Sequence, residues 1–432
     1  MTVAIESPAE APLEVTRTEA TRLWARLGWM SFGGPTAQIA LMHRWLVDER
    51  RWLREREFLD ALGFCMLLPG PEAMQLATYC GWKLHGVRGG VVAGSLFVLP
   101  GALVMLALSI LYAAVGALPS VIAAFAGIKA AALALVIEAL VRIGRRTLRS
   151  ARYVAIALLS FVAIYVLAVP FPLIVVAAAL IGWLSPAEAG GSGAPRPAVP
   201  LGGTLRTVAT WLALWVVPLA ALTVVFGPGH LLSQLAWFFS KLAVVTFGGA
   251  YAVLGYMSQE VVTGKGWLAP GQMIDGLGLA ETTPGPLILV TEFVGFVAAH
   301  GAHPGSPWVF GLLGAAVALW STFVPCFLWI LAGAPYLTAL RASPRLQEGL
   351  AAITAAVLGV ILNLAVWFGL HVVFGAVETR HLSPIHLTLP QWATLEWRMV
   401  AMVVASAVLL TRFRWSVHLV IGVMAIVALA TR

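Results

Sequence analysis

Long stretches that contain no charged residue are the feature that most limits how this sequence can fold. They cover residues 89–128, 153–187, 207–240, 304–340 and 349–377, and shorter ones follow at 400–411 and 415–431. About 20 apolar residues cross the hydrocarbon core of a membrane. Backbone groups inside lipid must pair within the protein, so apolar spans of this length are helices. The sequence therefore predicts an all-α integral membrane protein.

The composition excludes several other classes of protein. Of the 432 residues, 60% are hydrophobic and 11% are charged, whereas a soluble domain has about 25% charged residues. The net charge of +8 comes from arginines that cluster between apolar stretches, as in membrane proteins, so we expect no nucleic-acid partner. Cys65, Cys80 and Cys326 lie in apolar stretches and are expected to be core thiols. We find no nucleotide, metal or cofactor motif, so we expect no cofactor and no catalytic site.

Two arginine clusters indicate which loops lie in the cytoplasm. One cluster lies at residues 44–56 and the other at 142–152, and basic loops stay on the cytoplasmic side. Both clusters share one side only if residues 57–83 enter and leave the membrane by the same face. We therefore predict a re-entrant hairpin over 57–83, bent at Pro69-Gly70-Pro71.

Segments rich in Gly and Pro divide the chain. We predict a disordered tail at 1–18, a first membrane repeat at 19–184, a flexible cytoplasmic linker at 185–205, an unpaired membrane helix at 206–226, and a second membrane repeat at 227–432. The linker prediction depends on its Gly, Ser and Pro content, which is typical of flexible segments.

The second half of the sequence repeats motifs of the first half. A shift of 215 residues places Phe32-Gly33-Gly34 on Phe247-Gly248-Gly249, and Pro69-Gly70-Pro71 on Pro284-Gly285-Pro286. Trp52-Leu53 falls on Trp267-Leu268 in the same way. An odd number of spans separates the two copies, so we expect the repeats to be inverted in the membrane. Inverted repeats with broken helices are typical of secondary transporters, whose binding sites lie near the bilayer midplane.

The broken helices suggest where an anion binds. Helices that restart after Gly34, Pro71, Gly249 and Pro286 leave backbone N–H groups free in their first turns. Each helix N-terminus carries roughly +0.5 charge, so four of them together balance a dianion. The alternative is that these Gly and Pro residues only permit tight turns between helices.

Polar side chains beside the breaks complete the predicted site. Arg26 and Lys241 occupy equivalent positions in the two halves, as do Ser31 and Thr246. Glu72 is the candidate for proton coupling, because a buried carboxyl group holds its proton more tightly. The full predicted binding site consists of Arg26, Ser31, Phe32, Gly33, Gly34, Pro35, Gln38, Pro69, Gly70, Pro71, Glu72, Gln75, Lys129, Lys241, Thr246, Phe247, Gly248, Gly249, Thr282, Thr283, Pro284, Gly285 and Pro286.

Four of these residues have simpler alternative roles. Arg26 and Lys241 extend from apolar helices, and the alternative is that they reach the lipid headgroups. Glu72 alternatively complements the N-terminus of its own helix. Lys129 alternatively pairs with a carboxylate such as Glu138.

These motifs together resemble the chromate ion transporter family. The resemblance is carried by Phe32-Gly33-Gly34-Pro35, Trp52-Leu53 and Leu68-Pro69-Gly70-Pro71-Glu72-Ala73-x-Gln75, and covers residues from about 20 to 430. The repeated motifs of the second half resemble the two-domain, long-chain members. That half has Ala250 at the position of Pro35 and Leu287 at the position of Glu72, so equal roles for the two halves are not expected.

The resemblance implies export of chromate from the cytoplasm across the bacterial inner membrane, which lowers chromate toxicity. The implied energy source is the membrane potential or the proton gradient. Sulfate is a tetrahedral dianion like chromate and is expected to compete, and the alternative functions are a sulfate or oxyanion uptake permease and an anion channel. Besides membrane lipid and the ion, a homodimer is a possible partner, formed through a small-residue face such as Gly90-x3-Gly94.

Overall fold

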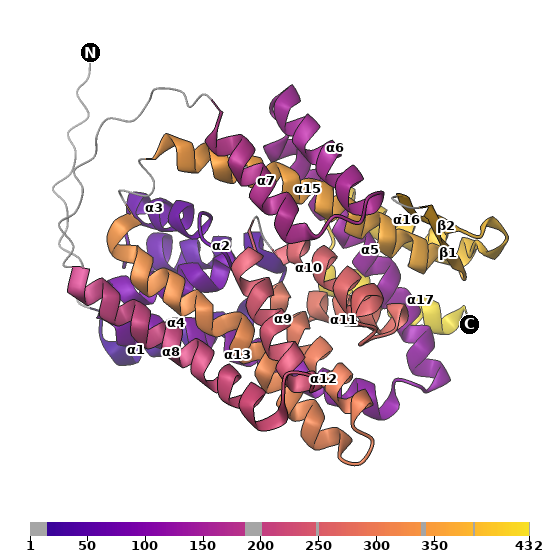
Figure 1. Ribbon diagram of the computed structural model, residues 1–432, viewed down its shortest axis with the longest axis horizontal. Helices are drawn as coiled ribbons and strands as arrows, with labels where there is room; N and C mark the ends of the chain where they lie inside the picture. The colour runs from indigo at the N-terminus through magenta and orange to yellow at the C-terminus, as the bar shows by residue number, and fades with distance from the viewer. Residues whose placement is uncertain (1–14, 186–200, 248–249, 338–342, 383–384, 432) are drawn as a thin grey trace.

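The computed structural model describes residues 15–185, 201–247, 250–337, 343–382 and 385–431, and most of them are helical (Figure 1). This confirms the predicted all-α membrane class. Among the described residues, five segments are long and apolar enough to cross a membrane: Glu72–Val115, Pro119–Thr147, Gly202–Phe226, Pro307–Tyr336 and Pro344–Val373. Shorter apolar helices accompany them, so the protein is a multi-pass membrane protein.

The helices of the two halves follow one another in the same order. The first half contains α1 (Arg17–Met30), α2 (Gly34–His43), the π-helix η1 (Arg44–Glu49), α3 (Glu55–Cys65), α4 (Glu72–Val115), α5 (Pro119–Thr147), α6 (Ala151–Tyr165) and α7 (Phe171–Trp183). The second half contains α9 (Leu231–Val245), α10 (Ala250–Gln259), the π-helix η2 (Glu260–Gly264), α11 (Pro270–Thr282), η3 (Leu287–Leu289), α12 (Val290–Ala302), α13 (Pro307–Gly333), η4 (Ala334–Tyr336), α15 (Pro344–Val373), η5 (Trp392–Thr394), α16 (Trp397–Thr411) and α17 (Val417–Ala430). Both predicted breaks in each half separate helices, and a π-helix follows the first break in both.

One helix, α8 (Leu201–Phe226), lies between the halves. It runs along the outside of α13, where the Trp320 indole N–H donates to the carbonyl oxygen of Leu214 at 3.1 Å (Figure 1). Its first residue falls inside the predicted linker at 185–205, of which 186–200 lie outside the described residues. Similarly, α1 begins inside the predicted tail at 1–18, of which 1–14 lie outside the described residues.

The long helix α4 folds back on itself. Gly86 interrupts the helix because its φ angle is +64°. Residues other than glycine rarely adopt this conformation. The two parts of α4 on either side of Gly86 pack closely. The carbonyl oxygen of Gly89 leaves no room for a Cβ at Gly81, and the Thr78 hydroxyl leaves no room for a Cβ at Gly94. The first part of α4 is therefore antiparallel to the second.

The segment 57–83 begins and ends on the same side of the fold. Lys83, near the end of the first part of α4, lies 3.6 Å from the carboxylate of Glu57 at the start of α3. A re-entrant hairpin requires this arrangement. Gly90 and Gly94, by contrast, are buried inside the protein against Thr78. The prediction that their face is exposed to pair chains is wrong, because the second part of α4 uses it to pack on the first.

Helices at equivalent places in the two halves run in opposite directions. Leu331 of α13 lies beside Gly90 of α4, and Phe327 lies beside Gly94. The second part of α4 and α13 are therefore antiparallel. The same is true of α5 and α15, because Leu358 approaches Gly144 while Leu133 approaches Gly369. The halves also interleave: α6 and α7 pack on α15, and α16 and α17 pack on α5 (Figure 1).

A short antiparallel hairpin is the one strand pair in the described part of the chain. It consists of β1 (Val377–Leu382) and β2 (Ile385–Pro390), with Val377 opposite Pro390. The Tyr165 hydroxyl at the end of α6 donates to the carbonyl oxygen of Thr388 at 2.8 Å. This hairpin was not expected from the sequence, and it forms most of the connection between α15 and α16.

Candidate functional site

The first break in each half is made by a hydroxyl side chain at the end of a helix. The Ser31 hydroxyl donates to the Leu27 carbonyl oxygen at 2.6 Å, and the Thr246 hydroxyl donates to the Leu242 carbonyl oxygen at 2.6 Å. Both residues leave helical geometry, with ψ of 65° and 84°. Their own carbonyl groups therefore become available to partners outside the helix.

Each Pro-Gly-Pro motif bonds to the break of the other half. The Gly285 N–H donates to the Ser31 carbonyl oxygen at 2.7 Å, and the Gly70 N–H donates to the Thr246 carbonyl oxygen at 2.8 Å. The φ angles of Gly285 and Gly70 are +85° and +127°, values that favour glycine. The prolines on either side have no N–H, so the glycine supplies the single donor of each motif.

Gln38 on α2 ties the first of these contacts together. Its side chain is 1% exposed, and Nε2 donates to the carbonyl oxygens of Ser31 at 3.0 Å and of Gly285 at 2.6 Å. Valine, at position 253, occupies the equivalent place in the second half. The five residues Ser31, Gln38, Gly70, Thr246 and Gly285 form what we name the break crossing, which is chemically unequal in the two halves.

The hydrogen bonds of the break crossing use some of the backbone N–H groups that were predicted to bind an anion. The N–H groups of Gly70 and Gly285 already donate to protein carbonyls. Within the described part of the chain, no acceptor faces the N–H groups of Gly33 and Gly34, at the start of α2. The equivalent Gly248 and Gly249 lie outside the described residues. The free donors are thus at the start of α2 rather than within the Pro-Gly-Pro motifs.

The remaining predicted residues near the breaks have local roles. Glu72 is the first residue of α4, where a carboxylate complements the helix N-terminus. The Gln75 amide donates to the Pro69 carbonyl oxygen at 2.6 Å, and its own oxygen is buried with no hydrogen-bond partner among the described residues. The hydroxyls of Thr282 and Thr283 donate to carbonyl oxygens one turn earlier in α11.

The aromatic and proline members of the breaks also have clear positions. The Phe32 ring meets the His418 ring edge-on at 4.7 Å, which connects the first break to α17. Pro35 lies in the first turn of α2, where its missing N–H costs nothing. Phe247 is half-buried, and Pro71, Pro284 and Pro286 are buried.

Arg26 and Lys241 lie outside the break crossing. Both side chains are exposed, with the Arg26 guanidinium 5.0 Å from the centre of the Trp45 ring and the Lys241 ammonium 5.7 Å from that of Tyr256. Their equivalent placement agrees with the repeat. It also agrees with the alternative in which both heads extend toward the membrane surface.

Lys129 pairs with a carboxylate of the other half. Its Nζ lies 3.0 Å from Asp275 on α11, and the Tyr112 hydroxyl donates to the other oxygen of Asp275 at 2.9 Å. Glu138, the partner suggested by the sequence, lies 3.3 Å from Arg142 instead. The alternative that Lys129 forms an ion pair with a carboxylate is therefore confirmed, but the partner is Asp275 and not Glu138.

Sequence reasoning missed two further features. Glu292 on α12 is 1% exposed, and it is the one acidic residue in the apolar stretch 284–300, a signal that could have found it. His230 and His303 lie in separate loops, with their Nε2 atoms 3.2 Å apart. Burial, and then the neighbouring His303, lowers the pKa of His230. Nothing in the sequence links these two loops.

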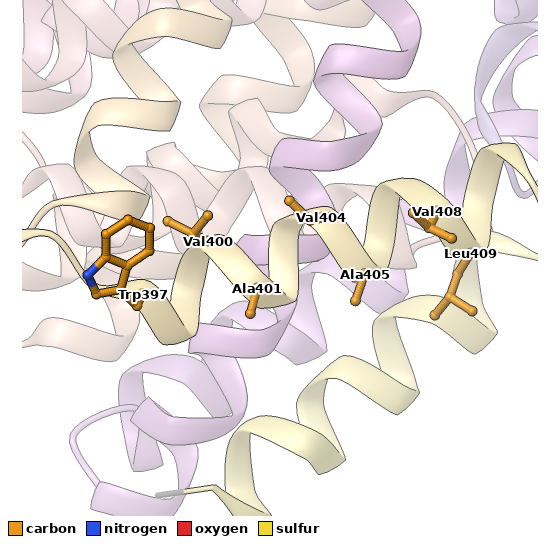
Figure 2. A pocket seen from close by; sticks show the side chains of 7 residues that line it. All are labelled: Trp397, Val400, Ala401, Val404, Ala405, Val408 and Leu409. Carbon is orange, nitrogen blue, oxygen red and sulfur yellow. The ribbon is translucent and has the colours of Figure 1, made fainter.

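The hollows on the surface differ in chemistry. One of about 570 Å³ runs along α16 and is lined only by apolar side chains from Trp397 to Leu409, as Figure 2 shows. An oxyanion needs hydrogen-bond donors, so this hollow suits lipid instead. Another of about 440 Å³ lies between α10, α15 and β2, and has polar walls that include Ser258, Asn363 and His371.

Comparison with known proteins gives the family. The model of the chromate transporter family matches residues 18–183 and residues 233–430. A chromate transport protein of Pseudomonas aeruginosa is 34% identical over 341 residues, covering 78% of this chain and 77% of that protein. Another, of Cupriavidus metallidurans, is 30% identical over 373 residues, covering 84% and 85%. No solved structure gives a significant match. The matched ranges span most of the sequence, and the chain therefore belongs to the chromate transporter family.

Proposed function

We propose that this protein is a secondary transporter that exports chromate from the cytoplasm across the bacterial inner membrane and so confers chromate resistance. The observation that carries the proposal is that both halves match the chromate transporter family, each over the part that contains its broken helices. The relatives are named transport proteins, which favours transport over catalysis. Sulfate, a dianion of the same shape, is a competing ligand.

Two inverted repeats are part of the proposal. The opposed directions of α4 and α13, and of α5 and α15, support the inversion. The two family matches leave out α8, which supports its role as the unpaired helix that turns the second half over. In such transporters the substrate site lies where the repeats meet. The break crossing is the place where the broken helices of the two halves bond to each other.

The oxyanion is proposed to bind beside the break crossing. The free N–H groups of Gly33 and Gly34 point from the start of α2, and α4 restarts after Pro71 in the same way. These N-termini attract negative charge. Arg26 and Lys241 then act on the approaches to the site, where an exposed cation raises the local concentration of anions.

The membrane potential supplies a sufficient driving force for export. Moving one charge through 100 mV is worth about 2.3 kcal/mol, so a dianion that leaves a negative interior gains about 4.6 kcal/mol. At about 1.4 kcal/mol for each factor of ten, this sustains a chromate gradient of about 2,000-fold. A proton gradient is therefore not required for export.

Uptake of labelled chromate into inside-out membrane vesicles tests the proposal. Vesicles that contain the protein and are energised to acidify their lumen are expected to accumulate chromate, an uncoupler to stop this, and excess sulfate to reduce it. Vesicles without the protein are the control. Chromate or sulfate entry into right-side-out vesicles instead would mean an uptake permease or a channel, and would overturn export.

A pair of arginine variants in the same vesicles tests the proposed approach to the site. Arg26→Ala is expected to reduce chromate uptake with membrane insertion intact. Arg22→Ala, one helical turn earlier on α1 and also exposed, is the matched control and should transport normally. If both variants match the wild type, Arg26 does not contribute to binding.

A further inference from the structure

Glu292 is an acid in a place that normally excludes one. It lies on α12, six residues after Pro286, and is 1% exposed. Its Oε2 is buried without a partner, and no hydrogen bond or ion pair of the carboxyl group is found among the residues that the structure describes. The equivalent residue of the first half is Ala77, so the repeat itself does not require an acid here.

Among the described residues, no cation or hydrogen-bond donor contacts the Glu292 carboxyl group. The titratable groups on α12 and on the helices that pack against it are His300 on α12, Glu72, Tyr79, Cys80, Lys83, His85, Arg88 and Tyr112 on α4, Lys241 on α9, Asp275 and Glu281 on α11, and Cys326 on α13. Of the cations on α4, Lys83 pairs with Glu57, His85 bonds to the Val15 carbonyl oxygen, and Arg88 is exposed.

Most of these groups have other partners. Lys241 stands over the Tyr256 ring, Asp275 binds Lys129 and Tyr112, and Tyr251 donates to Glu281. A buried carboxyl group with no cation or donor is stable only when it carries a proton.

The helix of Glu292 is linked to the break crossing through α13. The neighbouring Thr291 accepts a hydrogen bond from Thr322 of α13 at 3.4 Å. One turn further along α13, the Cys326 sulfur lies 3.0 Å from where a Cβ of Gly70 would be. The helix that carries Glu292 therefore packs through α13 against one of the two glycines of the break crossing. A negative charge on Glu292 would act on an anion bound there.

We propose that Glu292 carries a proton across the membrane together with the oxyanion and in the same direction. This inference rests on the proposed transport function. Glu292 takes up a proton from water on the side where the dianion loads, as the site closes, and releases it to water on the other side. The carboxylate repels a dianion and the neutral acid does not, so each ligand favours the other by the same factor. One net negative charge crosses per cycle instead of two, so with no pH difference a potential of 100 mV sustains a chromate gradient of about 40-fold rather than the roughly 2,000-fold of a dianion that crosses alone.

Charge stoichiometry in proteoliposomes tests this coupling. Purified protein is reconstituted with chromate on both sides, the potential is clamped with potassium and valinomycin, and chromate flux and internal pH are recorded together. For a tenfold chromate gradient without a pH gradient, net flux should reverse at about 59 mV if one net charge moves, and at about 30 mV if two move. We expect about 59 mV for the wild type, with protons moving alongside chromate.

Variants at position 292 separate coupling from folding. Glu292→Gln keeps the shape of the neutral acid, so it should carry chromate without protons and reverse near 30 mV. Glu292→Asp keeps a carboxyl group and should retain proton movement with a shifted pH profile. Glu348→Gln is the control, because this acid lies on α15 near Arg152 and Tyr153, away from α12.

The outcomes that overturn the proposal are distinct. A wild type that reverses at 30 mV, protons that move against chromate, or a Glu292→Gln variant that still moves protons would each refute it. If Glu292→Gln does not fold, the wild-type reversal potential and the Glu292→Asp profile still decide the question. No chromate flux from the wild type in either orientation would refute the transport function itself, and this inference with it.

Discussion

Gly70 and Gly285 each combine a backbone conformation that suits glycine with the single N–H donor of a Pro-Gly-Pro motif. We predict that Gly70→Ala destabilises the protein by about 1–3 kcal/mol, the usual cost of holding a side-chain-bearing residue in such a conformation. A Cβ at this position would also lie 2.6 Å from Gln75 Nε2 and 3.0 Å from Cys326 Sγ. Thermal unfolding in detergent should show a midpoint several degrees lower.

The control for this substitution is another glycine. Gly422 on α17 has nothing within 4 Å of its Cβ position. Gly422→Ala should leave the midpoint unchanged or raise it slightly, since alanine is favoured in a helix by up to about 1 kcal/mol. Equal midpoints for Gly70→Ala and the wild type would mean that the break between the helices can relax, and that the close contacts at Gly70 are not limiting.

The equivalence of single residues in the two halves could be recognised from the sequence. Ser31 and Thr246 were recognised as equivalent, and both end their helices with the same hydroxyl-to-carbonyl bond. Partners from distant parts of the sequence were not predictable. Lys129 and Asp275 meet only because α5 packs on α11, and the second bond of Gln38 reaches Gly285 in the other half.

The ion pair between Lys129 and Asp275 connects elements of the two halves, and a double-mutant cycle tests its role. Lys129→Met should cost about 3–5 kcal/mol of folding stability, because it leaves the buried Asp275 carboxylate without its cation. Lys129→Met/Asp275→Leu should recover most of that loss. Unfolding midpoints in detergent give the stability, and chromate uptake in vesicles gives the function.

The same cycle separates a structural ion pair from a binding role for Lys129. A double variant that is folded and transports normally supports the structural pair. A double variant that is folded and inactive would mean that Lys129 acts on the ion. The control is the pair of Arg142 and Glu138, which is more exposed and should contribute no more than about 0.5 kcal/mol.

At the scale of elements, the helix breaks were predictable because Gly and Pro act locally on the backbone. For the fold-back of α4 at Gly86, the sequence predicted only that residues 57–83 return to the face where they enter. The two parts of α4 pack closely because small residues such as Gly81 and Gly89 let their backbones touch. The hairpin of β1 and β2 was missed, since the apolar pattern that identified membrane helices says nothing about a polar loop.

At the scale of the whole molecule, hydrogen bonds and helix packing join the two halves. Each Pro-Gly-Pro motif bonds to the opposite break, α6 and α7 pack on α15, and α16 and α17 pack on α5. The repeat itself could be found in the sequence because its motifs recur at one spacing. The interleaving could not, because apolar helices of similar composition have no preferred partner until their side chains pack.

Inverted orientation is a property of the whole molecule, and two equivalent positions can test it. Arg54 and Ala269, related by the shift of 215 residues, precede α3 and α11 and are both exposed. Their backbone angles match, with φ and ψ of −74° and 151° against −67° and 153°. A cysteine at either place therefore has the same local environment, and only the side of the membrane differs.

Labelling with a membrane-impermeant maleimide reads that side. Cys65, Cys80 and Cys326 are buried and are replaced by alanine to remove background. In intact cells Ala269→Cys should react, whereas Arg54→Cys, in the basic loop, should react only after the membrane is permeabilised. Labelling of both from one side would make the repeats parallel. The two breaks would then open to the same side, and alternating access by rocking one repeat against the other would lose its geometric basis.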